Sequence, residues 1–560
     1  MLPDGSMPGS KNQNVYQPLS LLKNRRFGRS LLLIVLASVF PPIFLYSRNY
    51  GRFPLSVMIP PAIIIAIVCV ALWMVSLTFT KRHEKSALII AINLLFFFSY
   101  GDMAALMHPL SISFGDLFSI GYRKLYCCLF VILNGALFVI LKRMPGIELV
   151  CSKMIQTTVV VAIIISLGTL AFEKGSDGKN DLPRQDERLS ELLENAEMTA
   201  SSSVTPDIYH IILDAHPRTD ILQEYFNHDN SRFIGFLKDH GFVVPRYSWS
   251  NYAHTDLSIP ATLNFSYIHD NFPGNDKECA SNRQYAYGLR AEALVMRFLQ
   301  KKGYQVYLTE NGFESAVSGC ADHILKPNTG ALEMLWDEFN YGMVRMTPAR
   351  IIMESSRFPR VSFFVQHRRR IRYALDFLSN AHKEKGPKYV LAHIVAPHTP
   401  IVFGPNGEEL QQGPHYLENP SGDTGKFIEA SRNEVMFLDS IVAQTISRMI
   451  AADSNCVIIL QSDHGEFAQW PQEEYPDTAV LKQRHGILNA LRIPGRQVCI
   501  SDTMTAINTY PMVLNALFGT TIPQLQDRVF YSSIASPFKV FDISTKLGLE
   551  PDGDFGLKTR

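Results

Sequence analysis

Hydrophobic and polar positions follow two different patterns along the chain. Up to about residue 172, long apolar runs succeed one another with few charged residues inside them. Each run approaches or reaches the roughly 20 apolar residues that a helix needs to cross a bilayer. A buried bundle in a soluble protein does not explain so many nearly uncharged runs in succession. We therefore expect five membrane-spanning helices, at about 30–47, 54–79, 87–107, 125–141 and 155–172.

Basic residues between these runs indicate how the helices are oriented. Lysine and arginine gather before the first run, at 23–29, after the second, at 81–85, and after the fourth, at 142–153. The alternate loops hold only two basic residues each. Because loops rich in Lys and Arg stay in the cytoplasm, we expect a cytoplasmic N-terminus. Five crossings then place the chain after residue 172 outside the cytoplasm, and miscounting one helix would invert this topology.

After residue 205 the pattern changes to short, strongly apolar runs that alternate with amphipathic stretches. The run DIYHIILD at 207–214 has the length and β-branched composition of a buried strand. Strands that alternate with helices predict an α/β fold, here an α/β/α sandwich with a mostly parallel central sheet. Further strands are expected at 304–309, 388–396 and 457–460, and helices at 289–301 and 427–451.

These patterns predict three parts. An all-α transmembrane domain of five helices occupies 1–172, a polar linker rich in Glu, Lys, Asp, Gly and Ser occupies 173–205, and an extracytoplasmic domain occupies 206–560. The net charge of +1 gives no reason to expect a nucleic-acid partner. The 8 cysteines show no CxxC spacing, and a disulfide between Cys279 and Cys320 is an open alternative for an extracytoplasmic domain.

Chemically active side chains follow three of the expected strands. Asp214 ends the first strand, His398 follows the third, and Asp463 and His464 follow the fourth. Because the carboxyl ends of parallel strands meet at one edge of a sheet, we expect these side chains to lie close together. Asp and His are natural ligands for Zn²⁺ or Mn²⁺, and a hydroxyl from the loop at 248–264 would be activated as a nucleophile beside the cation. The alternative is that Asp463 caps a helix and His464 lies on the surface.

The motifs together resemble the alkaline phosphatase/sulfatase-like superfamily of hydrolases and transferases, over about residues 205–535. Asp214 matches the strand-end acid of that superfamily, and the sequence DHGE at 463–466 matches its late metal-binding motif. The sequence TDLSIP at 255–260 is similar to the T-x-x-S-x-P of phosphoethanolamine transferases, whose threonine is the nucleophile. Three separated motifs in the right order make this resemblance more specific than any one of them.

The resemblance implies roles for individual residues. Asp214, Thr255, Asp463 and His464 are expected to bind the metal, and Thr255 is expected to be the catalytic nucleophile. Ser258 is the competing nucleophile, because the usual sulfatase spacing from the proline would select it. Its alternative role is to cap the following helix.

Departures from the superfamily pattern indicate which ester the protein acts on and how many metal ions it binds. The chain lacks the C-x-P-S-R of true sulfatases, and His464 stands where they have Asn, which favours phosphate over sulfate. A full second set of ligands is missing, so we expect one divalent metal ion, Zn or Mn. His398, in an APHTP loop similar to a phosphate-binding S-H-x-P loop, and His485, further along the chain, are expected to bind substrate.

The whole chain is similar to bacterial membrane-bound sulfatase-like proteins, which are related to phosphoethanolamine transferases and lipoteichoic acid synthases. The resemblance implies a multi-pass protein of the bacterial inner membrane with a periplasmic catalytic domain. Its expected activity is metal-dependent transfer of a phospho-substituent, of the phosphoethanolamine or glycerol phosphate type, from a phospholipid to an envelope glycan or lipid through a phospho-threonine. Two alternatives stay open: a sulfatase-like phosphodiesterase or sulfuric-ester hydrolase, and a non-catalytic membrane scaffold or sensor.

Overall fold

The computed structural model divides into two compact units, and each is described by itself. The first unit comprises Met1–Arg48, Leu55–Thr169 and Arg345–Pro348, and the second comprises the rest of the chain. The structure describes residues 19–49, 53, 55–107, 112–114, 118–120, 122–176, 185–197, 205–270, 284–312, 320–328, 338–353, 363–410, 424–467, 476–496, 498, 500–534 and 536–549. Cys279 lies outside these residues, so its pairing with Cys320 stays a prediction.

The first unit consists mainly of long apolar helices. The helices that begin in this part of the chain are α1 (Leu19–Arg48), α2 (Ile59–Thr80), α3 (His83–Phe98), α4 (Tyr100–Met107), α5 (Tyr122–Arg143) and α6 (Ile147–Ser176), with a hairpin of β1 (Ile112–Phe114) and β2 (Phe118–Ile120) between α4 and α5. The expected span at 87–107 is divided between α3 and α4 at Ser99, whose backbone N–H donates to the carbonyls of both Leu95 and Phe96. This third span therefore stays a prediction.

Five helices of the described chain are long and apolar enough to cross a membrane. Four of these segments belong to the N-terminal part and coincide with expected spans: Arg26–Arg48, Leu55–Thr80, Lys124–Arg143 and Ile147–Ala171. The fifth, Thr424–Ala452, is α16 of the second unit. Leu438, Val442 and Ile446 of α16 are fully buried in the core of that unit, so we assign this helix to the folded domain rather than to the membrane.

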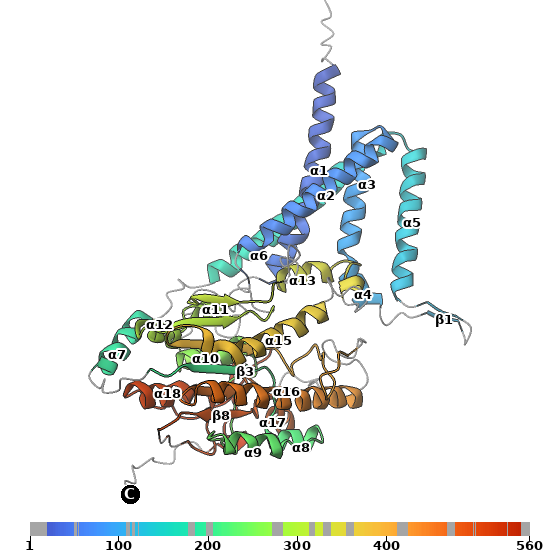
Figure 1. The fold of residues 1–560 in the computed structure, drawn as a ribbon. Helices are drawn as coiled ribbons and strands as arrows, with labels where there is room; N and C mark the ends of the chain where they lie inside the picture. The colour runs from blue at the N-terminus through green and yellow to red at the C-terminus, as the bar shows by residue number, and fades with distance from the viewer. Residues whose placement is uncertain are drawn as a thin grey trace, which may run out of the picture. The chain divides into compact units, whose positions relative to one another are not determined.

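The second unit is built around a six-stranded sheet in the order β5-β4-β6-β3-β7-β8. All neighbouring strands are parallel except β8, which pairs antiparallel with β7 at the edge. The strands are β3 (Ile208–Leu213), β4 (Gln305–Thr309), β5 (His323–Leu325), β6 (Lys388–Ile394), β7 (Val457–Gln461) and β8 (Asn489–Arg492). This sheet and the helices that flank it (Figure 1) confirm the predicted α/β fold.

The remaining elements of this part are mostly helices. They are α7 (Gln185–Glu197), α8 (Thr219–Tyr225), α9 (Ser231–Asp239), α10 (Thr255–Asn264), α11 (Gln284–Ala291), α12 (Leu294–Lys301), α13 (Glu338–Arg345), α14 (Arg350–Met353), α15 (Phe363–Asn380), α16 (Thr424–Ala452), α17 (Thr478–His485) and α18 (Thr509–Phe518), and a last pair of strands is β9 (Phe530–Tyr531) and β10 (Phe541–Asp542).

Both faces of the sheet are buried, as expected for parallel strands that are covered by helices. Along β3, Tyr209, Ile211 and Leu213 point into a core shared with α9, α15 and α16. Ile208 and Ile212 point into a core shared with α10, α12 and α18. Burial of each such Ile or Leu side chain contributes roughly 1.5–3 kcal/mol.

Helix α7 lies inside the stretch that the sequence assigns to a linker. Its apolar residues Leu189, Leu192 and Ala196 are buried in the same core as α12. The amphipathic pattern at this position therefore packs inside the second unit, and this stretch is more than a connection.

Candidate active site

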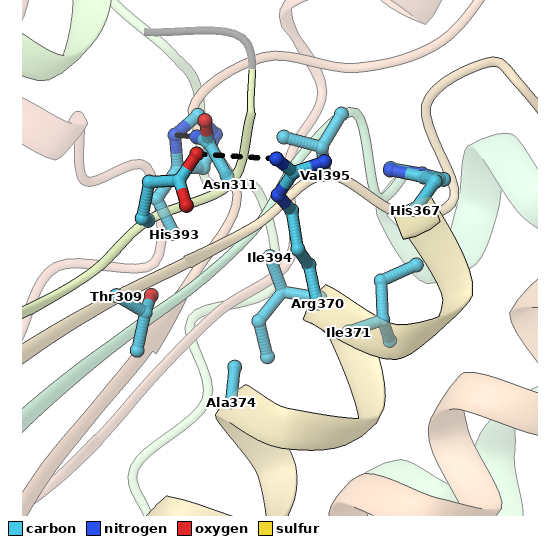
Figure 2. A pocket seen from close by; sticks show the side chains of 10 residues that line it. Thr309, Asn311, His367, Arg370, Ile371, Ala374, His393, Ile394 and Val395 are labelled. Atoms are coloured by element: carbon cyan, nitrogen blue, oxygen red, sulfur yellow. Dashed lines mark hydrogen bonds and ion pairs between the residues drawn. The ribbon is translucent and has the colours of Figure 1, made fainter. Parts of the chain in front are cut away.

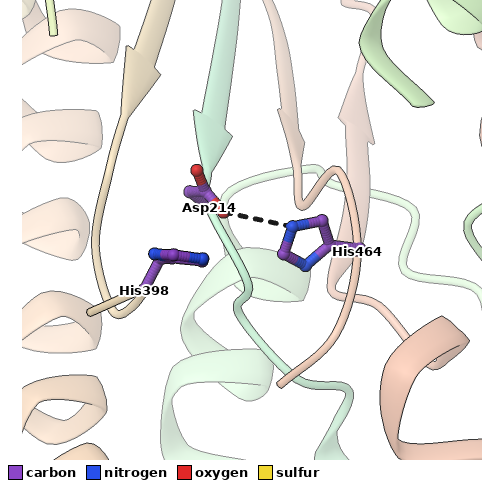
Figure 3. A group of neighbouring side chains, drawn as sticks. All are labelled: Asp214, His398 and His464. Carbon is purple, nitrogen blue, oxygen red and sulfur yellow. Dashed lines mark ion pairs between the residues drawn. The ribbon is translucent and has the colours of Figure 1, made fainter. Parts of the chain in front are cut away.

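The central strands end at the same level and bring the expected residues together. Leu213 of β3 is paired with Ile394 of β6, and Ile212 is paired with Gln461 of β7. The residues that follow these strands therefore share one edge of the sheet. Figure 3 shows Asp214, after β3, His398, after β6, and His464, after β7, with their side chains converging there.

The ring nitrogen Nε2 of His464 is the centre of this group. It lies 3.1 Å from Oγ1 of Thr255, 3.5 Å from Oδ1 of Asp214 and 3.6 Å from Oδ2 of Asp463. The other ring nitrogen, Nδ1, lies 3.0 Å from the carbonyl oxygen of Gly465 and donates to it, which leaves the lone pair on Nε2. Burial and the Arg484 guanidinium also lower the pKa of His464 well below its usual range, so this lone pair is retained at neutral pH.

The donor atoms in this group fit a divalent cation. Within the described part of the chain, Oδ1 of Asp214 and Oδ2 of Asp463 are buried without a hydrogen-bond partner, which is costly for carboxylate oxygens. The other oxygens of these side chains are held in place: Oδ2 of Asp214 is 3.1 Å from Nε2 of His393, and Oδ1 of Asp463 is 3.3 Å from the backbone nitrogen of Ala215. Two carboxylate oxygens, an imidazole nitrogen and a hydroxyl are a donor set that suits Zn²⁺ or Mn²⁺.

The two carboxylates of this group have pKa values displaced in opposite directions. Burial disfavours a charge on Asp214, but the charge of His398 and the hydrogen bond from His393 outweigh burial and hold its pKa well below the usual range. Burial, and then the charge of Asp214, raise the pKa of Asp463 to about 6. The two buried carboxylates repel each other, and a bound cation would relieve this repulsion.

Thr255 and Ser258, the two candidates for the nucleophile, have different surroundings. Thr255 is the first residue of α10, is partly exposed, and directs Oγ1 toward His464. Ser258 is fully buried and donates its hydroxyl hydrogen to the backbone carbonyl of Asp463 at 2.6 Å. The positive end of a helix also favours negative charge on a group at its first residue. The geometry therefore favours Thr255 as the nucleophile. The hydrogen bond from Ser258 holds the loop that carries Asp463.

The two histidines expected to bind substrate lie in different places. His398 belongs to the group, because its ligand atoms lie within 4.8 Å of those of Asp214 and His464. Burial lowers its pKa, but the charges of Asp214 and Glu466 outweigh burial, so the net shift is upward. His485 is fully buried, and its described hydrogen bonds are with Ser250. None of these described hydrogen bonds is with one of the four expected metal ligands. The role of His485 in substrate binding therefore stays a prediction.

Two further residues of this region are not among the expected site residues. Arg484 lies 3.3 Å from Nε2 of His464 through Nη2, although the sequence directs attention to the neighbouring His485. His393 lies inside β6 and contacts Asp214. Its position opposite Ile212 in the sheet register, one residue pair before the strand ends, is the signal that could have identified it.

His393 lines a small pocket of mixed polar and apolar character (Figure 2). It has a volume of about 10 Å³, enough for roughly one water molecule. Nδ2 of Asn311 is 2.9 Å from Nδ1 of His393, and Arg370 is paired with Glu310 at 3.3 Å. An amide that donates to Nδ1 leaves the proton of His393 on Nε2, where it is donated to Asp214.

Comparison with known proteins gives one family match. The family model described as Sulfatase matches residues 206–485, which is half of the chain. Comparison with curated proteins gives no match.

Several solved structures resemble the chain at low sequence identity. The C-terminal periplasmic domain of EcEptC from Escherichia coli in complex with Zn is 11% identical and covers 63% of this chain and 97% of its own, with a TM-score of 0.40. The corresponding domain of the phosphoethanolamine transferase EptC from Campylobacter jejuni is 11% identical and covers 51% and 79%, with a TM-score of 0.31. A 2-O GAG sulfatase, BT1596, is 12% identical and covers 62% and 75%, with a TM-score of 0.36. At these values the likenesses carry no argument about activity.

Proposed function

The chain belongs to the sulfatase family, and we propose that it is a membrane-anchored, metal-dependent phosphotransferase with Thr255 as its nucleophile. The observation that carries this proposal is the position of the Thr255 hydroxyl, 3.1 Å from Nε2 of His464 and beside the two buried carboxylates. A threonine in this place, without the C-x-P-S-R of true sulfatases, and a histidine at position 464 both favour phosphate over sulfate.

Asp214, Thr255, Asp463 and His464 would hold one divalent ion, which we propose to be Zn or Mn. When bound, such an ion lowers the pKa of a coordinated hydroxyl and neutralises charge that develops on a transferred phosphoryl group. Asp214 and Asp463 supply the two negative charges that balance the ion, while His393 and the backbone of Ala215 keep their free oxygens directed inward.

The proposed reaction exchanges one ester bond of a phosphodiester lipid for another. Oγ1 of Thr255 forms a bond to phosphorus while the bond from phosphorus to the glyceride oxygen breaks. The glyceride oxygen takes up the proton that the threonine hydroxyl gives up, so the diglyceride leaves as an alcohol and the head group stays on Thr255. A hydroxyl of the acceptor then attacks the same phosphorus, breaks its bond to Oγ1 and returns a proton to Thr255.

The substrates are proposed from the membrane anchor. Helices long and apolar enough to cross a membrane belong to the same chain as the site, which suits a phospholipid donor and an acceptor that is a glycan or lipid of the cell envelope. We propose that the protein spans the bacterial inner membrane several times and that the catalytic domain is periplasmic. A head group of the phosphoethanolamine or glycerol phosphate type is the proposed cargo.

Hydrolysis is the second candidate function, and the sulfatase family match favours it. In a phosphodiesterase, or in a sulfuric-ester hydrolase, water would take the place of the acceptor hydroxyl. A non-catalytic scaffold or sensor is the remaining alternative, but the two orphaned carboxylate oxygens count against it because they destabilise a domain that binds nothing there.

Comparison of envelope composition tests the proposed transfer. Lipids and polysaccharides are extracted from cells with and without the gene, and from cells that carry Thr255→Val, and are compared by mass. Transfer predicts one envelope component that loses a phospho-substituent in both altered strains. Release of free head group with no change in any envelope component would instead indicate hydrolysis, and no difference between the strains would contradict both activities.

A further inference from the structure

We propose that Glu434 is a positioning residue, whose hydrogen bonds to the loop after β6 hold His398 in place at the site (Figure 3). This inference rests on the proposed function, in which His398 binds the substrate. Glu434 lies within α16 and is fully buried. Residues 395–403, which follow β6 and include His398, are called the His398 loop below.

The start of the His398 loop is fixed at the edge of the sheet. The backbone nitrogen of His398 donates to the carbonyl of Asp214 at 3.1 Å, and its Nδ1 lies 2.8 Å from the carbonyl oxygen of Thr399. Pro397 and Pro400 have no N–H to donate, so the loop has few backbone donors with which to hold its own shape. Contacts from outside the loop therefore have to hold its further end.

Glu434 supplies polar contacts at that further end. Its Oε1 accepts hydrogen bonds from the backbone nitrogens of Val402, at 2.8 Å, and Phe403, at 3.1 Å. Both residues are fully buried, and a buried N–H without an acceptor is costly. One carboxyl oxygen thus satisfies two consecutive backbone donors and fixes the position of the chain just after His398.

The face of α16 that carries Glu434 also makes apolar contacts with the loop. Four residues of this face are spaced three or four positions apart, so they lie along one side of the helix: Phe427, Ala430, Glu434 and Phe437. Ile401 packs in one cluster with the first two, and the ring of Phe403 lies 4.6 Å from that of the last. Apolar contacts have no direction, so the hydrogen bonds to Glu434 are what fixes the loop along the helix.

Burial of the Glu434 carboxyl group decreases the stability of the domain. Within the described part of the chain, its second oxygen, Oε2, has no hydrogen-bond partner. Burial raises the pKa of Glu434 to about 8, although the two backbone hydrogen bonds oppose this shift. At neutral pH the group must therefore take up a proton when the chain folds, which lowers the unfolding free energy. An apolar side chain would suit the core better, so packing alone does not account for a glutamate here.

Glu434→Met and Glu434→Gln test whether the carboxyl group holds the loop. Methionine has a similar length but no strong acceptor, so the N–H groups of Val402 and Phe403 should move to find water. Hydrogen–deuterium exchange is measured by mass spectrometry on the full-length protein in detergent. The peptide that covers 397–403 should exchange faster in Glu434→Met, whereas a peptide within β6 should not. Glutamine keeps an oxygen acceptor, and its loop should exchange like that of the unmodified protein.

A double-mutant cycle with His398→Ala tests whether the effect reaches the substrate site through His398. The zinc-loaded protein is titrated with inorganic phosphate. Glu434→Met should weaken phosphate binding on the order of 10-fold, as for the loss of a hydrogen bond, and Glu434→Gln should retain most of the affinity. In the His398→Ala background, Glu434→Met should have no further effect. Zinc affinity, measured against a competing chelator, should stay close to that of the unmodified protein in Glu434→Met.

Ile446→Ala provides the matched control. Ile446 is fully buried on the same helix, roughly 18 Å beyond Glu434 along the helix axis. Its truncation leaves a cavity in the core and should destabilise the domain. Exchange of the peptide 397–403 and the affinity for phosphate should both stay close to those of the unmodified protein.

Several results would overturn the assignment. Unchanged exchange at 397–403 in Glu434→Met would show that the carboxyl group does not hold the loop. An unchanged phosphate affinity, or an equal loss with and without His398, would show that it does not act through His398. A parallel loss of zinc affinity would show that Glu434 only supports the fold of the whole site. The expected coupling, found together with no transfer by the unmodified protein, would support positioning by Glu434 and contradict the proposed reaction.

Discussion

The hydroxyl oxygen of Thr255 lies 3.1 Å from Nε2 of His464, although the two residues are 209 positions apart in the sequence. One begins α10 and the other follows β7, and both are positioned by the edge of a single sheet. The carboxylates of Asp214 and Asp463 complete the group. This contact links the proposed nucleophile to the proposed metal site.

Removal of a proposed metal ligand should lower the metal content of the purified protein. Asp463→Asn and His464→Gln each delete a charge or a donor atom at the centre of the group, and we expect metal affinity to fall by at least about 10–100-fold. Elemental analysis after dialysis against a weak chelator measures this. Asp439→Asn is the control, because Asp439 is a buried carboxylate that pairs with His216 at 2.9 Å outside the group. Full metal content in Asp463→Asn would refute the proposed site.

Ser258→Ala and Thr255→Val should separate the two candidate nucleophiles. Ser258 donates to the Asp463 carbonyl, so its loss should cost about 1 kcal/mol of unfolding free energy, as for one hydrogen bond, and should leave transfer largely intact. Thr255→Val keeps the shape of the side chain but removes the hydroxyl, and should abolish transfer while the protein stays folded. Transfer that survives in Thr255→Val and disappears in Ser258→Ala would reverse the assignment.

His393 should act through Asp214 rather than on the substrate. Its Nε2 donates to Oδ2 of Asp214, and Asn311 contacts its Nδ1. His393→Leu should therefore lower metal affinity by roughly 10–100-fold. His393→Gln places an amide N–H near the position of Nε2 and should recover most of that affinity in a zinc titration. Equal affinities for the two variants would show that the hydrogen bond to Asp214 has no such effect.

The catalytic domain should lose stability as the pH falls below about 6.5. Burial lowers the pKa of His210, His367 and His485 to about 3, whereas the unfolded chain has ordinary values near 6.5. Between these values the unfolded state binds more protons, so each histidine decreases the unfolding free energy by about 1.4 kcal/mol for every pH unit of acidification.

A single variant checks this pH dependence. In His210→Asn, the amide can still meet the hydroxyl of Tyr510, which lies 2.8 Å from Nδ1 of His210. The unfolding free energy of this variant, measured by denaturant titration at pH 5 and pH 7.5, should change less with pH than that of the unmodified protein. An equal or steeper change would show that His210 is not buried in its neutral form in the folded protein.

Much of the fold could be predicted because its central strands are long and strongly apolar. The run at 457–460 corresponds closely to β7, Val457–Gln461, and the run at 388–396 contains β6, Lys388–Ile394. The edge strand β8, Asn489–Arg492, was missed, because four residues that read NALR carry no periodic pattern. Its place in the sheet depends on tertiary pairing with β7.

The site was partly predictable for a related reason. Asp214, Asp463 and His464 directly follow strands, so the rule about strand ends identified them. Arg484 could not be identified in this way, because it reaches the site only where α17 ends against the Gly465 loop. The division of the predicted third span at Ser99 likewise depends on local hydrogen bonds. The mean hydropathy of the segment does not reveal such bonds.

Mass spectrometry of the Thr255 peptide tests the proposed covalent transfer most directly. The full-length, metal-loaded protein is incubated with phosphatidylethanolamine or with phosphatidylglycerol in mixed micelles, without acceptor, and is then quenched and digested. We predict a phosphoethanolamine or phosphoglycerol adduct on Thr255 that is absent from Thr255→Val and from protein stripped of metal. Unmodified Thr255 in a preparation that transfers the head group to an acceptor would contradict the proposal.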